Sequence, residues 1–295
     1  NGNELVDGDA NALSWGVLNT QGQNFVSHIA LAPVEGSGGL DIVAASRDTK
    51  QVFIFKYDGS VVAGWPRSVE NFIRAGMVVG DINNDGLFEI IAIDELGVLY
   101  VWKRSGTEYR DGDANPGTPG VFARLTGCSF NYSTPALADI DSDGRNEIIV
   151  GTQGNQLHAF NEDGTSVSGF PVALTDDISG SPAVGDVDGN GDLEIVINTR
   201  NGVVRAVNHN GTDLWTRTLT NGLFFAPSPA IGDVTGDGKL ETFVPTSNGK
   251  LYGLTYTGTD MPGFPTTYAA STYTESSPII ADIDGDGLSD VLIGS

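Results

Sequence analysis

Short apolar runs alternate with polar turns along the whole chain, and the same order of segments returns about every 47 residues. In one copy, the apolar segment SPAVGDV is followed by an acidic loop, a β-branched run, LEIVINT, and two further runs, VVRAVNHNG and LWTRTL. Alternating apolar positions bounded by Gly, Asn and Asp indicate strands joined by hairpin turns. Each repeat is therefore predicted to form four short strands, and the 40 glycines favour turns over long helices.

The acidic loop marks the copies of the repeat. It recurs at residues 80–90, 138–148, 185–195, 232–242 and 281–291, and a degenerate copy covers residues 32–42. Four strands repeated every ~40–50 residues are typical of a β-propeller blade, whereas the repeats of a solenoid, the alternative, are usually shorter or helical. We predict an all-β protein, a β-propeller of about six four-stranded blades. The repeats are expected near residues 28–74, 75–132, 133–179, 180–226 and 227–275.

The two ends of the chain are predicted to share the sixth blade. Residues 1–25 resemble residues 108–130, which contain the fourth strand of an earlier repeat, and residues 276–295 contain the first two strands of a repeat. A blade built from 276–295 plus 1–25 would close the ring, so residues 1–295 are interpreted as a single domain. A seven-bladed ring in a longer parent protein is the alternative. Because DVLIGS stops within the repeat pattern, we also expect flanking domains in the parent chain.

The acidic loops have the donor pattern of a calcium site. Oxygen side chains stand at positions 1, 3 and 5, a glycine at position 6 allows a sharp turn, position 7 offers its backbone carbonyl, and position 9 is Glu or Asp. Calcium prefers about six to eight oxygen ligands, whereas magnesium requires a tighter octahedron. An EF-hand needs a Glu at position 12, where these loops have Ala92, Val150, Ile197, Val244 or Ile293. Plain acidic turns are the alternative, but grouped carboxylates repel one another unless a cation lies among them.

About five Ca²⁺ ions are therefore predicted, one in each complete loop. The first repeat has Pro33, Glu35 and Ser37 at the corresponding positions, and no ion is expected there. The predicted ligands, loop by loop, are Asp81, Asn83, Asp85, Leu87 and Glu89; Asp139, Asp141, Asp143, Arg145 and Glu147; Asp186, Asp188, Asn190, Asp192 and Glu194; Asp233, Thr235, Asp237, Lys239 and Glu241; and Asp282, Asp284, Asp286, Leu288 and Asp290.

The repeats resemble the FG-GAP and VCBS family, the bacterial relatives of integrin α-subunit propellers. The resemblance rests on the SPAxGDxDGDGxxEI core, seen at residues 181–195 and 277–291, and on the turns GWP (64–66) and GFP (169–171 and 263–265). It implies a calcium-binding propeller, commonly seven-bladed. It also implies a protein found outside the cell or in the periplasm and used for adhesion or carbohydrate contact.

The charge balance restricts the partners. With 15 Lys and Arg against 38 Asp and Glu, the formal net charge is −23, which works against nucleic acid or an anionic membrane as a partner because both attract basic surfaces. Cys128 is alone, so no disulfide forms within the chain. The sequence also has no apolar run of roughly 18 residues that would insert into a membrane.

A column of aromatic and polar residues is the candidate ligand site. It enters the first strand of each repeat at the end opposite to the acidic loop. Aromatic rings with one arginine suit sugar stacking or a protein side chain, whereas packing between blades is the alternative. The candidate residues are Phe72, Arg74, Phe130, Tyr132, Phe224 and Tyr273.

No catalytic residues are predicted. His28, His158 and His209 fall in different repeats, and the chain has no GxSxG or HExxH motif. We expect a non-catalytic, calcium-stabilised adhesion or carbohydrate- or protein-binding module that is secreted, on the cell surface or periplasmic. The alternative is the propeller of a polysaccharide lyase, similar to rhamnogalacturonan lyases, that contacts or cleaves pectic glycans.

Two copies of the sequence DGDAN repeat the 1-3-5 spacing of oxygen side chains outside the acidic loops. Ala12 and Pro116 replace the glycine at position 6, so a solvated turn is favoured over an additional metal site. The residues concerned are Asp7, Asp9 and Asn11, and Asp111, Asp113 and Asn115.

Overall fold

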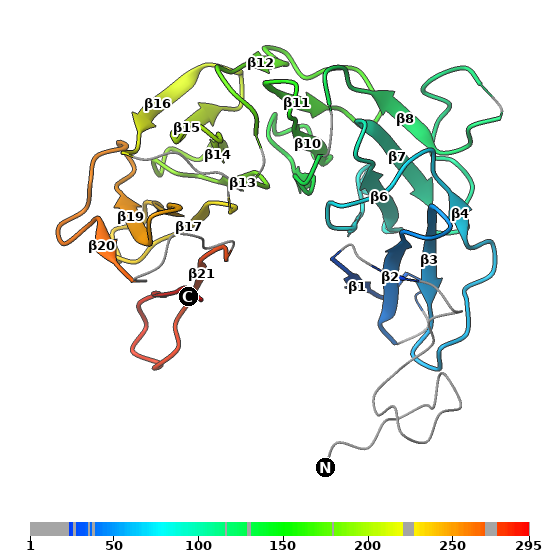
Figure 1. Ribbon diagram of the computed structural model, residues 1–295, viewed down its shortest axis with the longest axis horizontal. Helices are drawn as coiled ribbons and strands as arrows, with labels where there is room; N and C mark the ends of the chain where they lie inside the picture. Colours follow the sequence, from blue (N-terminus) through cyan, green and yellow to red (C-terminus); the bar gives the residue numbers. More distant parts are fainter. Residues whose placement is uncertain are drawn as a thin grey trace. The chain divides into compact units, whose positions relative to one another are not determined.

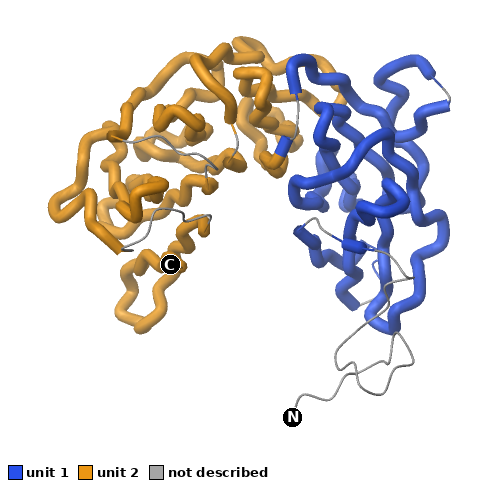
Figure 2. The backbone as a smooth tube through the Cα atoms, in the orientation of Figure 1, with its two compact units in different colours: residues 1–131 blue, residues 132–295 orange. Residues whose placement is uncertain are grey.

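The structure is a computed structural model that describes most of the chain. It describes residues 24–25, 28–34, 36, 39–115, 117–128, 131–178, 180–220, 227–268 and 276–294. The chain divides into two compact units, residues 1–131 and 132–295 (Figure 2). Each unit is described by itself.

Unit 1 contains two four-stranded antiparallel sheets in which the strands follow chain order (Figure 1). The first sheet consists of β1 (Ala30–Ala32), β2 (Asp41–Ser46), β3 (Gln51–Phe55) and β4 (Arg67–Ser68). The second consists of β5 (Val78–Gly80), β6 (Glu89–Ile93), β7 (Val98–Lys103) and β8 (Val121–Arg124).

Unit 2 contains three four-stranded sheets of the same topology and one two-stranded sheet. The four-stranded sheets are β9 (Ala136–Ala138), β10 (Glu147–Gly151), β11 (Gln156–Phe160) and β12 (Val172–Ala173); β13 (Ala183–Gly185), β14 (Glu194–Asn198), β15 (Val203–Asn208) and β16 (Asp213–Thr218); and β17 (Ala230–Gly232), β18 (Glu241–Pro245), β19 (Lys250–Leu254) and β20 (Thr266–Thr267). The two-stranded sheet is β21 (Ile279–Ala281) and β22 (Asp290–Leu292).

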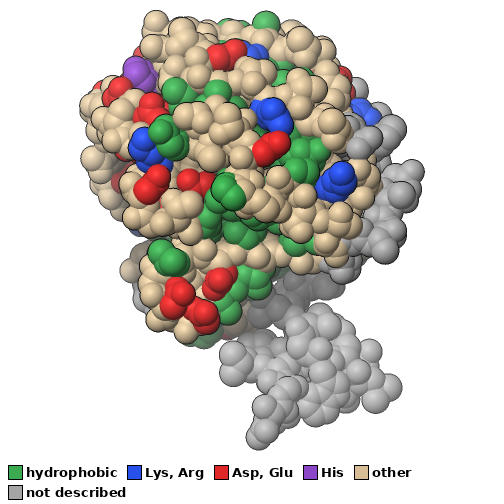
Figure 3. Space-filling view, turned by 90° about the vertical axis from the view of Figure 1, so that its left-hand side faces the viewer, with side chains coloured by type: hydrophobic (Ala, Val, Ile, Leu, Met, Phe, Trp, Pro, Cys, Tyr) green, Lys and Arg blue, Asp and Glu red, His purple; other side chains and the backbone are tan. Residues whose placement is uncertain are grey.

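The prediction of an all-β protein with four strands in each repeat is confirmed for the first five repeats. The sixth has two strands among the described residues, and it exposes Ile279, Ile283, Leu288 and Leu292. Figure 3 shows acidic and hydrophobic side chains next to one another on one face of the molecule. Of residues 1–25, which we expect to complete this blade, residues 1–23 lie outside the described residues. The shared blade and the single ring therefore stay predictions.

The second strand lies in the core in the second to fifth repeats. All five residues of β6, β10, β14 and β18 are buried, because these β-branched runs are covered on both faces. In unit 1, Tyr100 stacks on Trp102 with ring centroids 5.2 Å apart. Trp65 of the GWP turn packs edge-on against Trp102. The apolar period of the sequence thus corresponds to strands that are buried on both sides.

A ladder of serine hydrogen bonds joins successive repeats in unit 2. The hydroxyl of Ser181 accepts the backbone N–H of Thr134, that of Ser228 accepts the N–H of Ser181, and that of Ser277 accepts the N–H of Ser228, at 2.9–3.0 Å. These residues precede the proline that opens each first strand. Each of these serines therefore connects the start of the first strand in its own repeat to the start of the first strand in the preceding repeat.

Candidate metal centre

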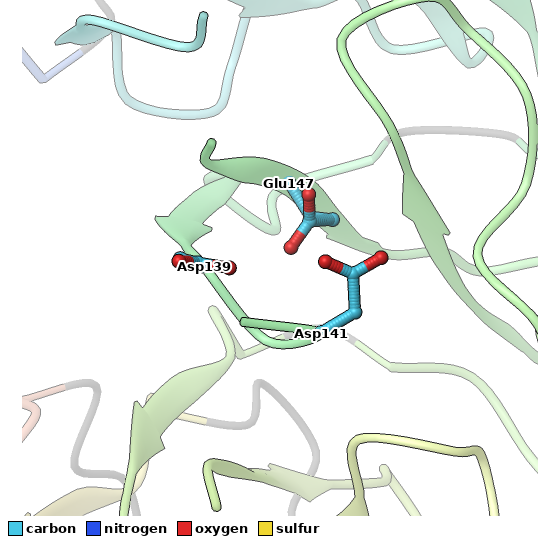
Figure 4. Close-up of side chains that lie close together, drawn as sticks. All are labelled: Asp139, Asp141 and Glu147. Carbon is cyan, nitrogen blue, oxygen red and sulfur yellow. The ribbon is translucent and has the colours of Figure 1, made fainter. Parts of the chain in front are cut away.

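Each acidic loop joins the first strand of a sheet to the second. Position 1 follows the first strand directly, and position 9 is the first residue of the second strand. Both ends of the loop are therefore anchored by paired backbone. Figure 4 shows the result in the third repeat, where the carboxylates of Asp139, Asp141 and Glu147 converge.

Side chains at positions 1 and 5 fold the loop backbone. One oxygen of the position-1 aspartate accepts the N–H of the position-6 glycine at 2.7–3.0 Å in all five loops. The side chain at position 5 accepts the N–H of position 7 at 2.7–3.0 Å. The glycines have positive φ, for example +98° at Gly191, a conformation that glycine adopts without steric cost.

The carboxylate at position 9 closes the loop from within the sheet. One of its oxygens accepts the N–H of position 2 at 2.8–3.2 Å in every loop. Sequence reasoning treated this residue only as a metal ligand and missed this second contact. The sequence nevertheless indicates this contact. In all five copies a carboxylate stands directly before a strand-forming run, and a carboxylate that is buried there needs a hydrogen-bond partner.

In two loops the second oxygen of the position-9 carboxylate has no partner within the protein. Oε1 of Glu147 and Oε1 of Glu194 are buried and have no hydrogen-bond partner. Burial, together with the charge of nearby aspartates, raises the pKa of Glu89 and of Glu147 to about 7 and raises that of Glu194 as well. A buried carboxylate without a partner destabilises the fold, and a cation between the acidic side chains would remove that cost.

Three loops bring three carboxylates together closely enough to share one ion. Ligand oxygens of the three residues lie within 4.8 Å of one another in the clusters Asp139–Asp141–Glu147, Asp186–Asp188–Glu194 and Asp282–Asp284–Asp290. In the other two loops, position 3 is Asn83 or Thr235, which supplies an uncharged oxygen instead. The donors are all oxygen, as Ca²⁺ requires. The three clusters are therefore consistent with Ca²⁺ sites.

In the DGDAN segment at residues 111–115, the carboxylate of Asp113 pairs with an arginine, unlike the carboxylates of the acidic loops. Asp113 accepts hydrogen bonds from Arg124 at 2.6 Å and from Thr118 at 2.9 Å, and the Arg124 guanidinium holds the pKa of Asp113 below its usual value. This carboxylate is already neutralised by an arginine, which supports the interpretation of a turn without metal. The copy at residues 7–11 lies outside the described residues.

The candidate ligand residues have different surroundings. Phe72 is partly buried, the Arg74 side chain is paired with Glu95 at 2.7 Å, and Tyr132 is 41% exposed. The Arg74 guanidinium is thus engaged within the protein. Phe130, Phe224 and Tyr273 lie outside the described residues.

His158 lies in β11 and its side chain is buried. The pH dependence of the free energy of unfolding therefore tests its burial. Its ring stacks on Phe160 with centroids 5.6 Å apart, and burial lowers its pKa to about 4. Because the unfolded chain binds this proton near pH 6.5 and the folded chain does not, stability is lost as pH falls from about 6.5 to 4. We expect His158→Phe to reduce this loss by about 3 kcal/mol, measured by urea unfolding at pH 7 and pH 4 in EDTA. An equal loss in the variant and the wild type would contradict the prediction.

Comparisons with known proteins agree with this geometry. A family profile described as FG-GAP-like repeat matches four overlapping segments, residues 81–150, 139–197, 186–244 and 233–293. No curated protein sequence matches the chain. Within the described residues, no helix is long and apolar enough to cross a membrane.

Two solved structures show the fold. The crystal structure of BBS1N in complex with ARL6DN is similar with a TM-score of 0.61 and 12% identity, covering 92% of this chain and 76% of that chain. The crystal structure of the V. cholerae biofilm matrix protein Bap1 is similar with a TM-score of 0.55 and 18% identity, covering 81% of this chain and 39% of that chain. The sheets described above are accordingly blades of a β-propeller-like fold.

Proposed function

The chain belongs to the FG-GAP-like repeat family, and from this premise we propose that it is a calcium-stabilised, non-catalytic propeller that binds a glycan or a protein outside the cell. The observation that carries the proposal is the convergence of three carboxylates in each of three loops, two of which include a buried glutamate. Extracellular calcium modules bind their ion with Kd of about 10⁻⁴–10⁻³ M, so a fold that depends on such loops suits a calcium-rich exterior.

Two further observations support an extracellular adhesion role. The similar structure Bap1 is named as a biofilm matrix protein, and we carry that setting over as part of the proposal. The formal charge of −23 disfavours nucleic acid and anionic membranes as partners. We propose that all five complete loops hold Ca²⁺ through the ligands named in the sequence analysis.

We propose that the candidate residues at the entries of the first strands contact a ligand, Phe72, Arg74 and Phe130 in unit 1 and Tyr132, Phe224 and Tyr273 in unit 2. Arg74 is held in place by Glu95. Tyrosine and phenylalanine rings bind sugar faces and apolar side chains, and Tyr132 remains substantially exposed.

Replacing Tyr132 should separate binding from stability. We expect Tyr132→Ala to weaken binding of a glycan identified on an array by about tenfold, as loss of one aromatic contact does, and to change the free energy of unfolding by less than about 0.5 kcal/mol. Tyr57→Ala is the matched control because Tyr57 is a tyrosine of unit 1 that is 73% exposed, whereas Tyr132 belongs to unit 2. Equal losses of binding and melting temperature would instead indicate that Tyr132 packs between blades.

The competing enzymatic function has a direct assay. A polysaccharide lyase acting on pectic glycans creates an unsaturated product that absorbs ultraviolet light. We expect no increase in absorbance when the protein is incubated with pectic polysaccharides and calcium. Clear turnover would overturn the non-catalytic proposal.

A further inference from the structure

Several basic side chains in unit 1 lack an acidic partner among the described residues. Three of them, Arg47, Lys50 and Arg67, are called the cationic stripe together with Phe72. Cζ of Arg47 lies 5.7 Å from the centre of the Phe72 ring, and Nζ of Lys50 lies 5.3 Å from it. The ring attracts both cations and holds them close together. Arg47 and Lys50 thus place two positive charges at one ring in a chain of formal charge −23.

Carboxylates close to the stripe are engaged elsewhere. Glu70 is paired with Arg124 at 2.6 Å, and Glu95 is paired with Arg74 at 2.7 Å. The carboxylate of Asp48 accepts the backbone N–H of Asn24 at 3.0 Å. None of these three carboxylates forms an ion pair with Arg47, Lys50 or Arg67 among the described residues.

A cavity of about 300 Å³ adjoins the stripe at Arg67. It is lined by Arg67, Ser68, Glu70, Tyr100, Thr118 and Pro119, among others. Nε of Arg67 is buried and has no hydrogen-bond partner. Ligand pockets range from about 300 to 1,000 Å³, so this cavity has the size for one small ring.

The inserted segment after β7 forms one wall of the cavity. Thr118 donates a hydrogen bond to Asp113, and Arg124 bonds to both Asp113 and Glu70. The wall is thus fixed to the last strand of the first sheet. The DGDAN insertion therefore has a structural role, holding the wall of the cavity, that is separate from the calcium loops.

One hydrogen bond links the wall of the cavity to Lys50. Glu70 lines the cavity, and its backbone carbonyl accepts a hydrogen bond from Nζ of Lys50 at 2.9 Å. Residues 67–72 span at most about 20 Å when extended, which exceeds one sugar ring. A ligand with regularly spaced negative charges would reach Arg67 and the Arg47–Lys50 pair together.

We propose that the cationic stripe binds an acidic polysaccharide through its carboxylates, with one uronate ring in the cavity at Arg67 and a neighbouring uronate at Arg47 and Lys50. This inference rests on the proposed glycan-binding function and specifies the class of glycan. Arginine forms strong paired hydrogen bonds with carboxylate. The hydroxyls of Ser68 and Thr118 and the apolar walls of Val69 and Pro119 suit a sugar ring better than an extended acidic peptide.

The test measures binding of trigalacturonate by calorimetry in calcium-containing buffer. We expect Arg67→Gln to weaken binding by about tenfold, as loss of one charge-assisted contact does, and the double change Arg47→Gln with Lys50→Gln to weaken it at least as much. Lys250→Gln, which removes a positive charge from β19 in the other unit, is the matched control and should bind as the wild type does. Melting temperatures of the Arg47 and Lys50 variants should be unchanged, because Arg47 is exposed and Lys50 is partly exposed.

Three outcomes would contradict the proposal that the cationic stripe binds an acidic polysaccharide. They are no binding of trigalacturonate, equal binding by the variants, and equal affinity for the neutral maltotriose. Tighter binding of hexaglutamate would assign the stripe to an acidic peptide instead. If neutral glycans bind through Tyr132 while Arg67→Gln has no effect, the stripe is wrong and the glycan-binding function stands.

Discussion

Removing calcium should lower the melting temperature by about 10 °C or more. At a fivefold excess of calcium over Kd, each ion stabilises the native form by RT ln(1 + [Ca]/Kd), or about 1 kcal/mol. Five loops together contribute about 5 kcal/mol, which is comparable to the net stability of a whole domain. One kcal/mol shifts the melting temperature of a large domain by about 2–4 °C. Five ions would also offset about ten of the negative charges that oppose compaction.

The measurement is calorimetry of the protein with calcium, with EDTA, and with EDTA followed by excess magnesium. Magnesium should restore little stability because it needs a smaller octahedral site than these loops offer. A melting curve that is indifferent to EDTA, in protein shown by elemental analysis to be calcium-free, would leave the loops as acidic turns.

Two substitutions of Glu194 should separate loop closure from calcium binding. Glu194→Ala leaves the buried N–H of Val187 without its acceptor and opens a cavity, so we expect a loss of about 3 kcal/mol in calcium. The loss should be smaller in EDTA, where the change also removes a buried carboxylate that lacks a cation. Glu194→Gln retains an oxygen for that N–H but loses the charge. Because burial raises the pKa of Glu194, the glutamine variant should equal or exceed the wild type in EDTA and fall below it in calcium.

Asp192→Ala is the matched control for both substitutions. Asp192 occupies position 7, which is expected to ligate through its backbone carbonyl, and its side chain is 57% exposed. We expect a change below about 0.5 kcal/mol. If Glu194→Gln shows the same loss in EDTA as in calcium, Glu194 acts only through packing and the ion does not use its charge.

Much of the fold could be predicted because the information is local and repeated. The period of about 47 residues, the apolar runs and the turn residues each indicate the same four-stranded unit. Five of these units form the sheets that the sequence predicts. The loops were predictable for the same reason, since their donors lie within nine consecutive residues.

The sequence by itself determined the repeat, the strands and the oxygen-rich loops, because each depends on neighbours along the chain. Only the tertiary structure decided which charged side chains form ion pairs with one another. Arg124 pairs with Glu70 across 54 residues, and Arg74 pairs with Glu95 across 21. These pairs arise where different strands and turns meet, which no periodicity encodes. For that reason the sequence could propose Arg74 for the ligand site, whereas the structure engages Arg74 with Glu95 and leaves Arg47, Lys50 and Arg67 without a carboxylate partner among the described residues.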